Sequence, residues 1–380
     1  MNYDILIVGG GLTGLSLAGA LRHLPLRIAI IDIPQQAPDN RSIALSHGSR
    51  QVFEKYDLWT PLAASAMPIQ QVHISEQGRF GVTRFTAVEA RVPALGYAIP
   101  IKQLHQQLHQ SIQHTEWITG TVHAMARTET GWEVQVRQAD NELRPYRARF
   151  VVAADGAHST IRQLQNIPVV EQYAGDTAII ANITLARPHN HIAYERFTPT
   201  GAIALLPIAE KTYTLIWTVR SEFANDFLAL DTLPFIKKLQ REFGYRLGKF
   251  KDAAPRISYA IKQTYAEEQT KPHLVLLGNA AHTLHPIAAQ GFNLGLRDID
   301  CLAALIKTDF NAPDFLEKYS QQRIPDQKKL LEITNSLVRL FSHPSSLIRT
   351  SRNLGLFALD LPSPLKQAAC RYWMGIYTAR

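Results

Sequence analysis

The feature that most constrains this chain is a glycine-rich turn near its N-terminus, held between two short apolar segments. Residues 3–9, YDILIVG, are mostly aliphatic and end in glycine, as buried strands often do. Residues 12–24 have the apolar spacing of a helix, and residues 26–32, LRIAIID, form a second strand pattern. A strand, a glycine turn, a helix and a second strand in this order predict a βαβ unit and a parallel sheet.

The turn has the spacing GxGxxG. The first glycine permits the tight turn, the second lets the backbone approach a pyrophosphate, and the third allows close packing of helix on strand. The free N–H groups of the following helix would face the phosphates. Asp32 ends the second strand. An acid at this place accepts a hydrogen bond from a ribose 2′-OH and repels a 2′-phosphate, so the expected dinucleotide is NAD or FAD. The expected contacts are Gly9, Gly11, Leu12, Thr13, Gly14 and Asp32. A tight glycine turn without a ligand is the alternative.

Two later segments place polar or small residues directly after a strand. In AADGAHSTIR, residues 153–162, Asp155 and Gly156 predict a polar turn near the dinucleotide, although a turn that only caps a helix explains them too. In LLGNAAHTLHPIAAQGFN, residues 276–293, Asn279 could bind a sugar or ribitol hydroxyl. The alanines and Gly291 leave room for a planar ring, and the helix that follows would direct N–H groups at its edge.

The three segments, in this order, resemble the para-hydroxybenzoate hydroxylase-like class of FAD-dependent aromatic monooxygenases. RSIALSHGS, ERFTPTGAIALLPI, REFGYRLGK and RNLGL are similar to the ubiquinone-biosynthesis hydroxylases, most of all to the 2-polyprenyl-6-methoxyphenol hydroxylases, over Asp4 to about Gly375. The resemblance implies FAD as cofactor, O₂ and a polyprenyl-phenol as substrates, and hydroxylation through a flavin C4a-hydroperoxide. It also implies NAD(P)H as reductant and other ubiquinone-biosynthesis enzymes as partners.

The resemblance assigns further cofactor contacts. Arg41 would approach the flavin or pyrophosphate, and Val122 would contact the adenine through its backbone. The remaining contacts would be Asp155, Gly156, Asn279, Pro286, Gln290, Gly291, Phe292 and Asn293. Two positions depart from the class, because Asn279 replaces the usual Asp and Ala289 replaces the first Gly of GQG.

Catalytic candidates lie in the same segment. The Pro286 carbonyl could hold the phenol hydroxyl, and His285 could assist its deprotonation, although we favour a structural hydrogen bond for this histidine. His282 and His285 have metal-ligand spacing, but no third ligand accompanies them, so no metal is expected. The candidate substrate walls are Phe197, Leu205 and Trp217, of which Phe197 and Trp217 could equally be plain core.

The expected architecture is α/β: a Rossmann-like FAD-binding domain, an inserted antiparallel substrate sheet and a C-terminal helical region. Residues 35–50 are expected to begin as a polar loop and then become helical. FAD-binding segments are expected at 1–70, 101–168 and 266–325, substrate-domain strands at 71–100 and 169–265, and C-terminal helices at 326–380.

Composition limits location and partners. Two cysteines without a CxxC pair favour a reducing compartment, and neither a signal peptide nor a membrane-spanning stretch is apparent. The net charge is +8, and from residue 336 onward Asp360 is the only acid among many basic and apolar residues. This tail either packs on the main body or binds the cytoplasmic face of the inner membrane; no nucleic-acid motif accompanies the charge.

Rival functions share the glycine turn. A flavin oxidase or reductase, a sister ring hydroxylase acting at another carbon, an FAD-stabilised scaffold and an NAD-dependent dehydrogenase all remain open. The chain has a single dinucleotide fingerprint, so NAD(P)H would have to visit the FAD domain transiently, unless electrons come from elsewhere.

Overall fold

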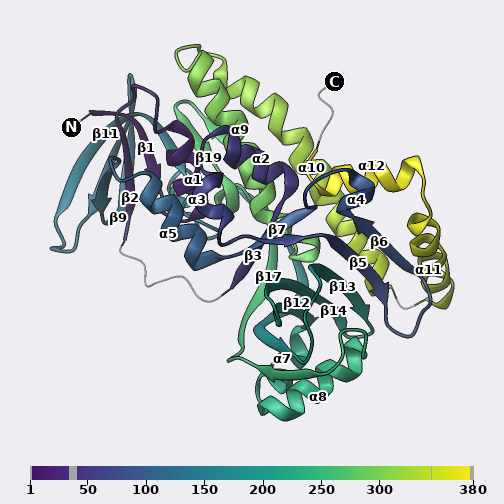
Figure 1. Ribbon diagram of the computed structural model, residues 1–380. Helices are drawn as coiled ribbons and strands as arrows, with labels where there is room; N and C mark the ends of the chain where they lie inside the picture. The colour runs from purple at the N-terminus through teal and green to yellow at the C-terminus, as the bar shows by residue number, and fades with distance from the viewer. Residues whose placement is uncertain (1, 34–40, 344, 377–380) are drawn as a thin grey trace.

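The computed structural model describes residues 2–33, 41–343 and 345–376 and confirms the predicted α/β fold (Figure 1). Its first sheet is eight-stranded, with the order β18-β19-β11-β1-β2-β8, and β9 and β10 extend it from β11. β1 runs parallel to both β2 and β11, and β11 runs parallel to β19. The strands are β1 (Asn2–Val8), β2 (Ile28–Asp32), β8 (Glu116–Thr119), β9 (Thr121–Thr128), β10 (Gly131–Arg137), β11 (Leu143–Ala153), β18 (Thr270–Lys271) and β19 (Leu274–Leu276).

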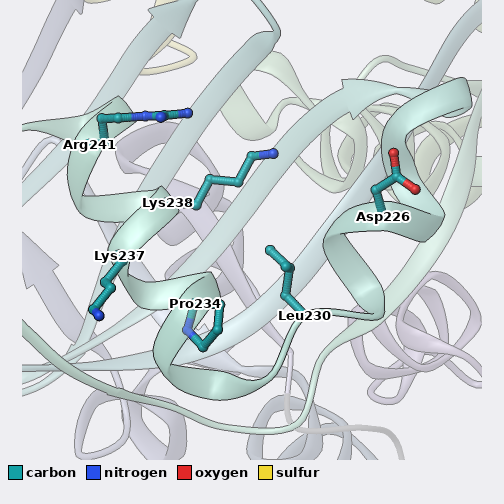
Figure 2. Close-up of a pocket in the computed structure, with 6 residues that line it drawn as sticks. All are labelled: Asp226, Leu230, Pro234, Lys237, Lys238 and Arg241. Atoms are coloured by element: carbon teal, nitrogen blue, oxygen red, sulfur yellow. The ribbon is translucent and has the colours of Figure 1, made fainter.

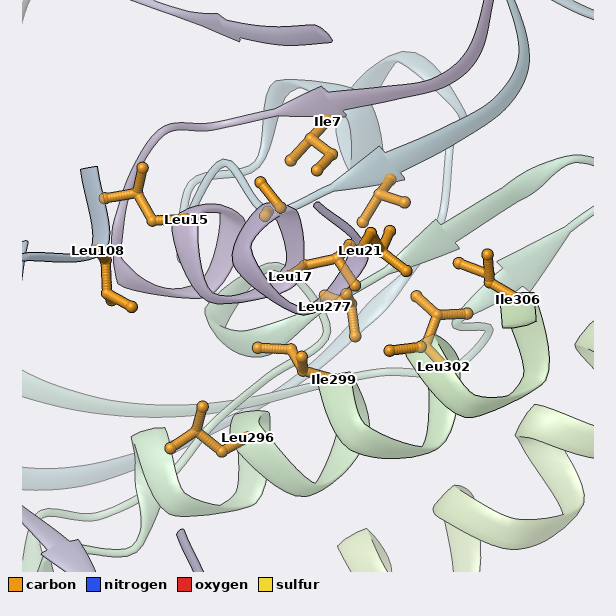
Figure 3. Close-up of a cluster of buried hydrophobic side chains, with 14 of the residues drawn as sticks. Ile7, Leu15, Leu17, Leu21, Leu108, Leu277, Leu296, Ile299, Leu302 and Ile306 are labelled. Atoms are coloured by element: carbon orange, nitrogen blue, oxygen red, sulfur yellow. The ribbon is translucent and has the colours of Figure 1, made fainter. Parts of the chain in front are cut away.

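Helices α1 (Leu12–Leu21) and α9 (Gly291–Asp309) pack on one face of this sheet. Figure 3 shows the side chains of Leu17 and Leu21 on α1 close to those of Ile299 and Leu302 on α9. The glycine turn before α1 and the segment before α9 meet at one end of the sheet, since a Cβ on Gly278 would lie 2.6 Å from the Thr13 hydroxyl at the start of α1. The predicted βαβ unit is thereby confirmed.

A second, nine-stranded sheet has the order β20-β17-β12-β15-β14-β13-β5-β6, with β16 paired to β12. It is antiparallel except where β13 runs parallel to β5. Helices α7 (Ser221–Leu228) and α8 (Thr232–Phe243) cover one of its faces. The strands are β5 (Gln71–Glu76), β6 (Val82–Thr86), β12 (Val169–Leu185), β13 (Ile192–Thr198), β14 (Gly201–Ala209), β15 (Thr212–Arg220), β16 (Phe250–Ala253), β17 (Ile257–Ala266) and β20 (His282–Thr283).

A small third sheet joins the two larger ones, with β7 between β3 and β4. Residues 42–46, expected within a loop turning helical, instead form β3; the helix begins only at His47, and residues 34–40 lie outside the described residues. The elements are β3 (Ser42–Ser46), β4 (Met67–Ile69), β7 (Gly96–Pro100), α2 (His47–Lys55), α3 (Trp59–Ala63), α4 (Ala87–Ala90), α5 (Ile101–Ser111) and α6 (Thr160–Leu164).

The C-terminal helices pack on the main body: α10 lies against α9, α11 against β5 and β6, and α12 against α4. The Arg352 guanidinium pairs with the buried Glu76 carboxylate and donates to the carbonyls of Leu340 and Phe341. These helices are α10 (Phe315–Ser342), α11 (Ser346–Asp360) and α12 (Pro364–Trp373). Among the described residues, none of the helices has the length and apolar character needed to cross a bilayer.

Candidate cofactor and substrate site

The glycines of the first turn divide into two structural roles. A Cβ on Gly9, whose φ is +107°, would lie 2.4 Å from the Ala154 carbonyl oxygen, and a Cβ on Gly14 would lie 1.9 Å from the Gly9 oxygen. These two positions therefore need glycine for packing. Gly11 is different, because no heavy atom lies within 4 Å of its Cβ position. Gly11 also caps α1 without a side chain, so free N–H groups of the helix face open space.

The same openness recurs at Gly156 and Gly291, where a Cβ would meet no heavy atom within 4 Å. Gly291 begins α9, whose N-cap residue, Gln290, makes no capping hydrogen bond through its side chain. Asp155 accepts a hydrogen bond from the Ile161 N–H through Oδ2 (3.1 Å), while its buried Oδ1 has no hydrogen-bond partner among the described residues. Two open helix N-termini and this carboxylate oxygen fit an elongated group with phosphates, hydroxyls and a planar ring, as FAD has.

Between them, Gly278 begins the short 3₁₀ turn η1 (Gly278–Ala280) with φ +57°, and a Cβ there would lie 2.6 Å from the Thr13 hydroxyl. Asn279 is exposed although both of its neighbours are buried, so its amide projects away from the core. The side chains of Leu12 and Phe292 instead pack against the core. Their expected role in binding would therefore rest on the backbone.

The remaining dinucleotide candidates have protein contacts of their own. Asp32 accepts a hydrogen bond from the Gly10 N–H through Oδ2 (2.8 Å), so part of this carboxylate fixes the turn itself. Val122 is buried in the core of the first sheet, on β9. The Arg41 guanidinium lies 5.8 Å from the centre of the Tyr259 ring. Their contacts with adenine, ribose and pyrophosphate remain predictions.

Asn293 fixes the turn that precedes α9. Its Oδ1 accepts from the Ser46 N–H (2.8 Å) and the Ser49 hydroxyl (2.7 Å), and its Nδ2 donates to the carbonyls of Ala44 (2.9 Å) and Ala289 (2.8 Å). All four hydrogen-bonding positions of this buried amide are thus used within the protein. Only the backbone of Asn293 is therefore left to contact the cofactor, as expected for this residue. Its side chain instead positions the turn, a role that the sequence did not reveal.

Ala289 lies in the 3₁₀ turn η2 (Ile287–Ala289) with φ +51°. This is the left-handed region, which costs a non-glycine residue about 1–2 kcal/mol. The alanine that replaces the expected first Gly of GQG thus keeps the backbone conformation that glycine favours. Next to it, the Gln290 amide donates to the Trp373 carbonyl and accepts from Arg297, which ties this turn to the C-terminal helices.

An apolar pocket of about 250 Å³ opens above this turn. Pro286, Gln290 and Asn293 lie at one end, together with Ser46 from β3. The second sheet forms one wall through Phe197, Ala204, Leu206 and Ile216. The C-terminal helices form the opposite wall through Leu337, Phe341, Leu356, Leu359, Trp373 and Met374. Few polar groups line the pocket, which suits an aromatic ring carrying an apolar tail.

The predicted substrate wall was wrong for two of its three residues. Leu205 and Trp217 face the opposite side of the second sheet, where Trp217 contacts Phe227 and Phe235 beneath α7 and α8. Because strand side chains alternate between faces, their neighbours Ala204, Leu206 and Ile216 face the pocket instead. Phe197 does line the pocket, and its ring stacks on Phe341 with the ring centres 3.5 Å apart.

His285 is buried, and burial lowers its pKa to about 4. Its Nδ1 accepts a hydrogen bond from the Ile287 N–H (3.2 Å), so in the neutral ring the proton sits on Nε2. That nitrogen points toward Asp176, whose Oδ2 is 4.0 Å away. In this arrangement His285 is a donor rather than a base. The Pro286 carbonyl already accepts from the Ala289 N–H, which leaves one lone pair for another donor.

Asp176 and His285 make opposite contributions to pH-dependent stability. Burial raises the pKa of Asp176 to about 6, although Arg220 lowers it in part. The folded protein therefore holds a proton that the unfolded chain has released, and Asp176 destabilises the fold as pH rises through this range. His285, with its lowered pKa, stabilises the fold over nearly the same range. In the wild type these two changes in unfolding free energy with pH have opposite signs and largely cancel.

We expect Asp176→Asn to remove the pH-dependent contribution of Asp176 to stability and to leave that of His285. At about pH 7 the variant should be about 2–3 kcal/mol more stable than the wild type, and at about pH 4 the difference should shrink to less than about 1 kcal/mol. Urea unfolding at both pH values measures this difference. Asp226→Asn, which changes an exposed carboxylate on α7, is the control and should show no such pH dependence. Equal stability of wild type and Asp176→Asn at both pH values would contradict the assignment.

A buried charge network lies behind the site. His282 Nε2 donates to Asp298 Oδ2 (2.7 Å), and the Arg323 Nε–H donates to the other oxygen (2.7 Å). Burial alone would raise the pKa of Asp298, but Arg323 and His282 outweigh it and lower the pKa. His282 is thus a partner of Asp298 and not of His285. The part of the chain that the structure describes has no cluster of three or more metal-binding side chains.

A separate hollow lies between α7 and α8, on the far side of the second sheet from the apolar pocket. Figure 2 shows the side chains around it, which come from Asp226, Leu230, Pro234, Lys237, Lys238 and Arg241. Lys238 lies over the Phe227 ring at 3.9 Å. Since none of these residues reaches the glycine turns, the hollow is not part of the candidate site.

Comparison with known proteins agrees with this geometry. A family model described as "FAD binding domain" matches residues 2–334. The ubiquinone hydroxylase UbiL of Rhodospirillum rubrum is 33% identical over 388 residues, covering 98% of this chain and 89% of that protein. The 3-demethoxyubiquinol 3-hydroxylase of Escherichia coli is 27% identical over 394 residues, covering 98% of each chain. The structure of a Klebsiella pneumoniae HpxO variant complexed with FAD shares the fold, with a TM-score of 0.80 at 15% identity over 99% of each chain. This chain therefore belongs to the ubiquinone hydroxylase family of FAD-binding monooxygenases.

Proposed function

We propose that this monooxygenase hydroxylates the ring of a polyprenyl-methoxyphenol with O₂ during ubiquinone biosynthesis. The observation that carries the proposal is the apolar pocket that ends at the turn formed by Pro286, Ala289 and Gln290, directly before Gly291. A phenol ring at that end would lie beside the open glycine edge, and its tail would lie along Phe197, Leu206 and the C-terminal helices. Bound FAD supplies the activation of O₂.

The chain's own residues bind and orient the substrate and exclude water. The pocket walls are aliphatic and aromatic, so they remove water from around the ring. The free lone pair of the Pro286 carbonyl can accept the phenol O–H. His285 is not among the residues that line the pocket, and its Nε2 points toward Asp176. We assign no base role to His285, since its Nδ1 is occupied by the Ile287 N–H.

The proposal includes the reductant and the place of action. NAD(P)H supplies the electrons by a transient visit, because the chain's single dinucleotide fingerprint is assigned to FAD. The reaction takes place in the cytoplasm, at the cytoplasmic face of the inner membrane, where a polyprenyl substrate is found.

Turnover under ¹⁸O₂ tests the reaction. The FAD-loaded protein, given NAD(P)H and a short-tailed prenyl-methoxyphenol, should form a hydroxylated phenol carrying one labelled oxygen. A flavin oxidase would give hydrogen peroxide and no label in a phenol, which would refute the proposal. Cells that lack the protein should accumulate the prenyl-methoxyphenol, whereas accumulation of a demethoxy-quinol or prenylphenol would assign the chain to a sister hydroxylase.

Filling the pocket gives a matched pair of variants for this assay. Ala204→Phe places a ring in the pocket and should abolish hydroxylation while FAD stays bound. Ala209→Phe adds the same ring at an exposed position at the end of β14 and should retain activity. Full activity of Ala204→Phe would show that the substrate does not bind in this pocket.

A further inference from the structure

Helix α11 packs one face on the protein and leaves apolar side chains exposed on another. Arg352, Asn353 and Leu356 are buried against the body. On the other side Leu347, Leu354 and Phe357 are 74%, 53% and 51% exposed. At about 100° of rotation per residue, these three side chains fall within an arc of about 80°. An isolated surface leucine needs no explanation, but a stripe along a helix does.

Neighbouring elements continue this stripe. Phe80, at the turn between β5 and β6, is 68% exposed, and its ring centre lies 6.2 Å from that of Phe357. Figure 1 shows α4, α11, α12 and the tip of β5 and β6 together at one end of the molecule. We define the C-terminal apolar face as Phe80, Val88, Leu347, Leu354, Phe357, Leu361 and Leu365, all of them exposed.

The elements around this face are strongly basic. Residues 76–91 and 336–376 together contain eight basic and three acidic residues, a net charge of +5. Each of the three acids is already paired within the protein, Glu76 with Arg352, Glu89 with Lys366 and Asp360 with Arg84. Arg79, Arg91, Arg339 and Arg371 are exposed beside them. The charge complement of this face is therefore an anionic surface.

The same helices separate this face from the substrate pocket. Leu356 and Leu359 of α11 and Trp373 of α12 line the pocket from inside, while Leu354 and Phe357 project outward. The pocket volume of about 250 Å³ is below the range of about 300–1,000 Å³ that encloses a drug-sized ligand. It can take a ring and the start of a tail, so the rest of a longer tail must extend outside the pocket.

We propose that the C-terminal apolar face docks on an anionic lipid bilayer and places the pocket where a prenyl tail can pass into it from the lipid. A second copy of the chain is a poorer occupant, because a two-fold contact would set the same positive surfaces against each other. Apolar side chains within a basic surround are the pattern that binds bilayer surfaces. The passage of the tail rests on the proposed function; the docking names the surface that would hold the protein at the membrane, and it does not depend on the proposed reaction.

Flotation with lipid vesicles tests the docking with the FAD-loaded full chain. The protein should float with vesicles of phosphatidylcholine and phosphatidylglycerol, and much less with phosphatidylcholine alone or at high salt. Leu354→Ser/Phe357→Ser should lower binding to the anionic vesicles by about tenfold or more, because two apolar side chains no longer enter the bilayer. Leu233→Ser/Tyr245→Ser, which changes two exposed apolar residues near α8, should bind as the wild type does.

Several outcomes would overturn the docking: no flotation of the wild type, unchanged flotation of Leu354→Ser/Phe357→Ser, or a wild-type dimer that this variant converts to a monomer. Turnover of a short-tailed, water-soluble phenol should be equal in the variant and the wild type. Turnover of a long-tailed phenol in vesicles should fall with binding. Because flotation needs no turnover, failure of the docking and failure of the proposed reaction are distinguishable.

Discussion

Gly291→Leu should fold normally and be purified without FAD. No heavy atom lies within 4 Å of the Cβ position of Gly291, and the residue begins α9, so the protein itself accommodates a side chain there. The space that the leucine would fill is the one assigned to the flavin. Because forcing extra methylene groups into an occupied site costs about 1–3 kcal/mol, we expect FAD affinity to fall by about 5- to 150-fold. Flavin absorbance per protein and urea unfolding of the apoprotein measure the two effects separately.

Two other glycines serve as comparisons for this variant. Gly355, on exposed α11, also has no heavy atom within 4 Å of its Cβ position, so Gly355→Leu should retain FAD. Gly14 has no room for a Cβ, so Gly14→Val should fail to fold rather than lose only the cofactor. Full FAD occupancy in Gly291→Leu would refute the close approach of the ring to this turn.

Arg352→Met should destabilise the fold by about 3–5 kcal/mol, because it leaves the buried Glu76 carboxylate without its main partner. Burial alone would raise the pKa of Glu76, and Arg352 with Arg349 holds it lower than usual. The substitution also removes the donors to the Leu340 and Phe341 carbonyls at the end of α10. Urea unfolding at neutral pH gives the loss in unfolding free energy.

A double-mutant cycle separates the ion pair from the packing of Arg352. Glu76→Gln/Arg352→Met has no buried charge left unpaired, so we expect it to regain at least about half of the loss. Arg144→Met breaks exposed contacts to Asp140 and Glu142 and should change stability by less than about 1 kcal/mol. If Arg352→Met were as stable as the wild type, water or Arg349 would have to stabilise the Glu76 carboxylate in place of Arg352.

The sequence predicted the features that local chemistry determines. The strand, turn and helix around Gly9, Gly11 and Gly14 follow from residue spacing over a short stretch, and the structure has them where expected. The segment before Gly291 was predicted from its small residues, and the structure brings it to the same end of the sheet. Both predictions need only nearest neighbours along the chain.

Predictions that needed the register of a sheet were less successful. Trp217 and Leu205 are as apolar as the residues that line the pocket. They belong to the core because they lie on the face of the second sheet that α7 and α8 cover. A helix at Ser221–Leu228 was also missed. The four hydrogen bonds of Asn293 join residues far apart in the sequence, and a single amide in a helix carries no sign of them.

The first sheet is assembled from segments that are far apart in the order of synthesis. β1 ends at Val8, but its neighbour β11 ends at Ala153 and β19 begins only at Leu274. At about 5–20 residues per second, a ribosome needs roughly 13 to 53 s to make the chain between Val8 and Leu274. The glycine turn is thus among the first residues to leave the ribosome, but the sheet that supports it is complete only after β19 has been made. Newly made chains would hold an unfinished, exposed strand edge for that time, and we therefore expect chaperones to bind them before the sheet is complete.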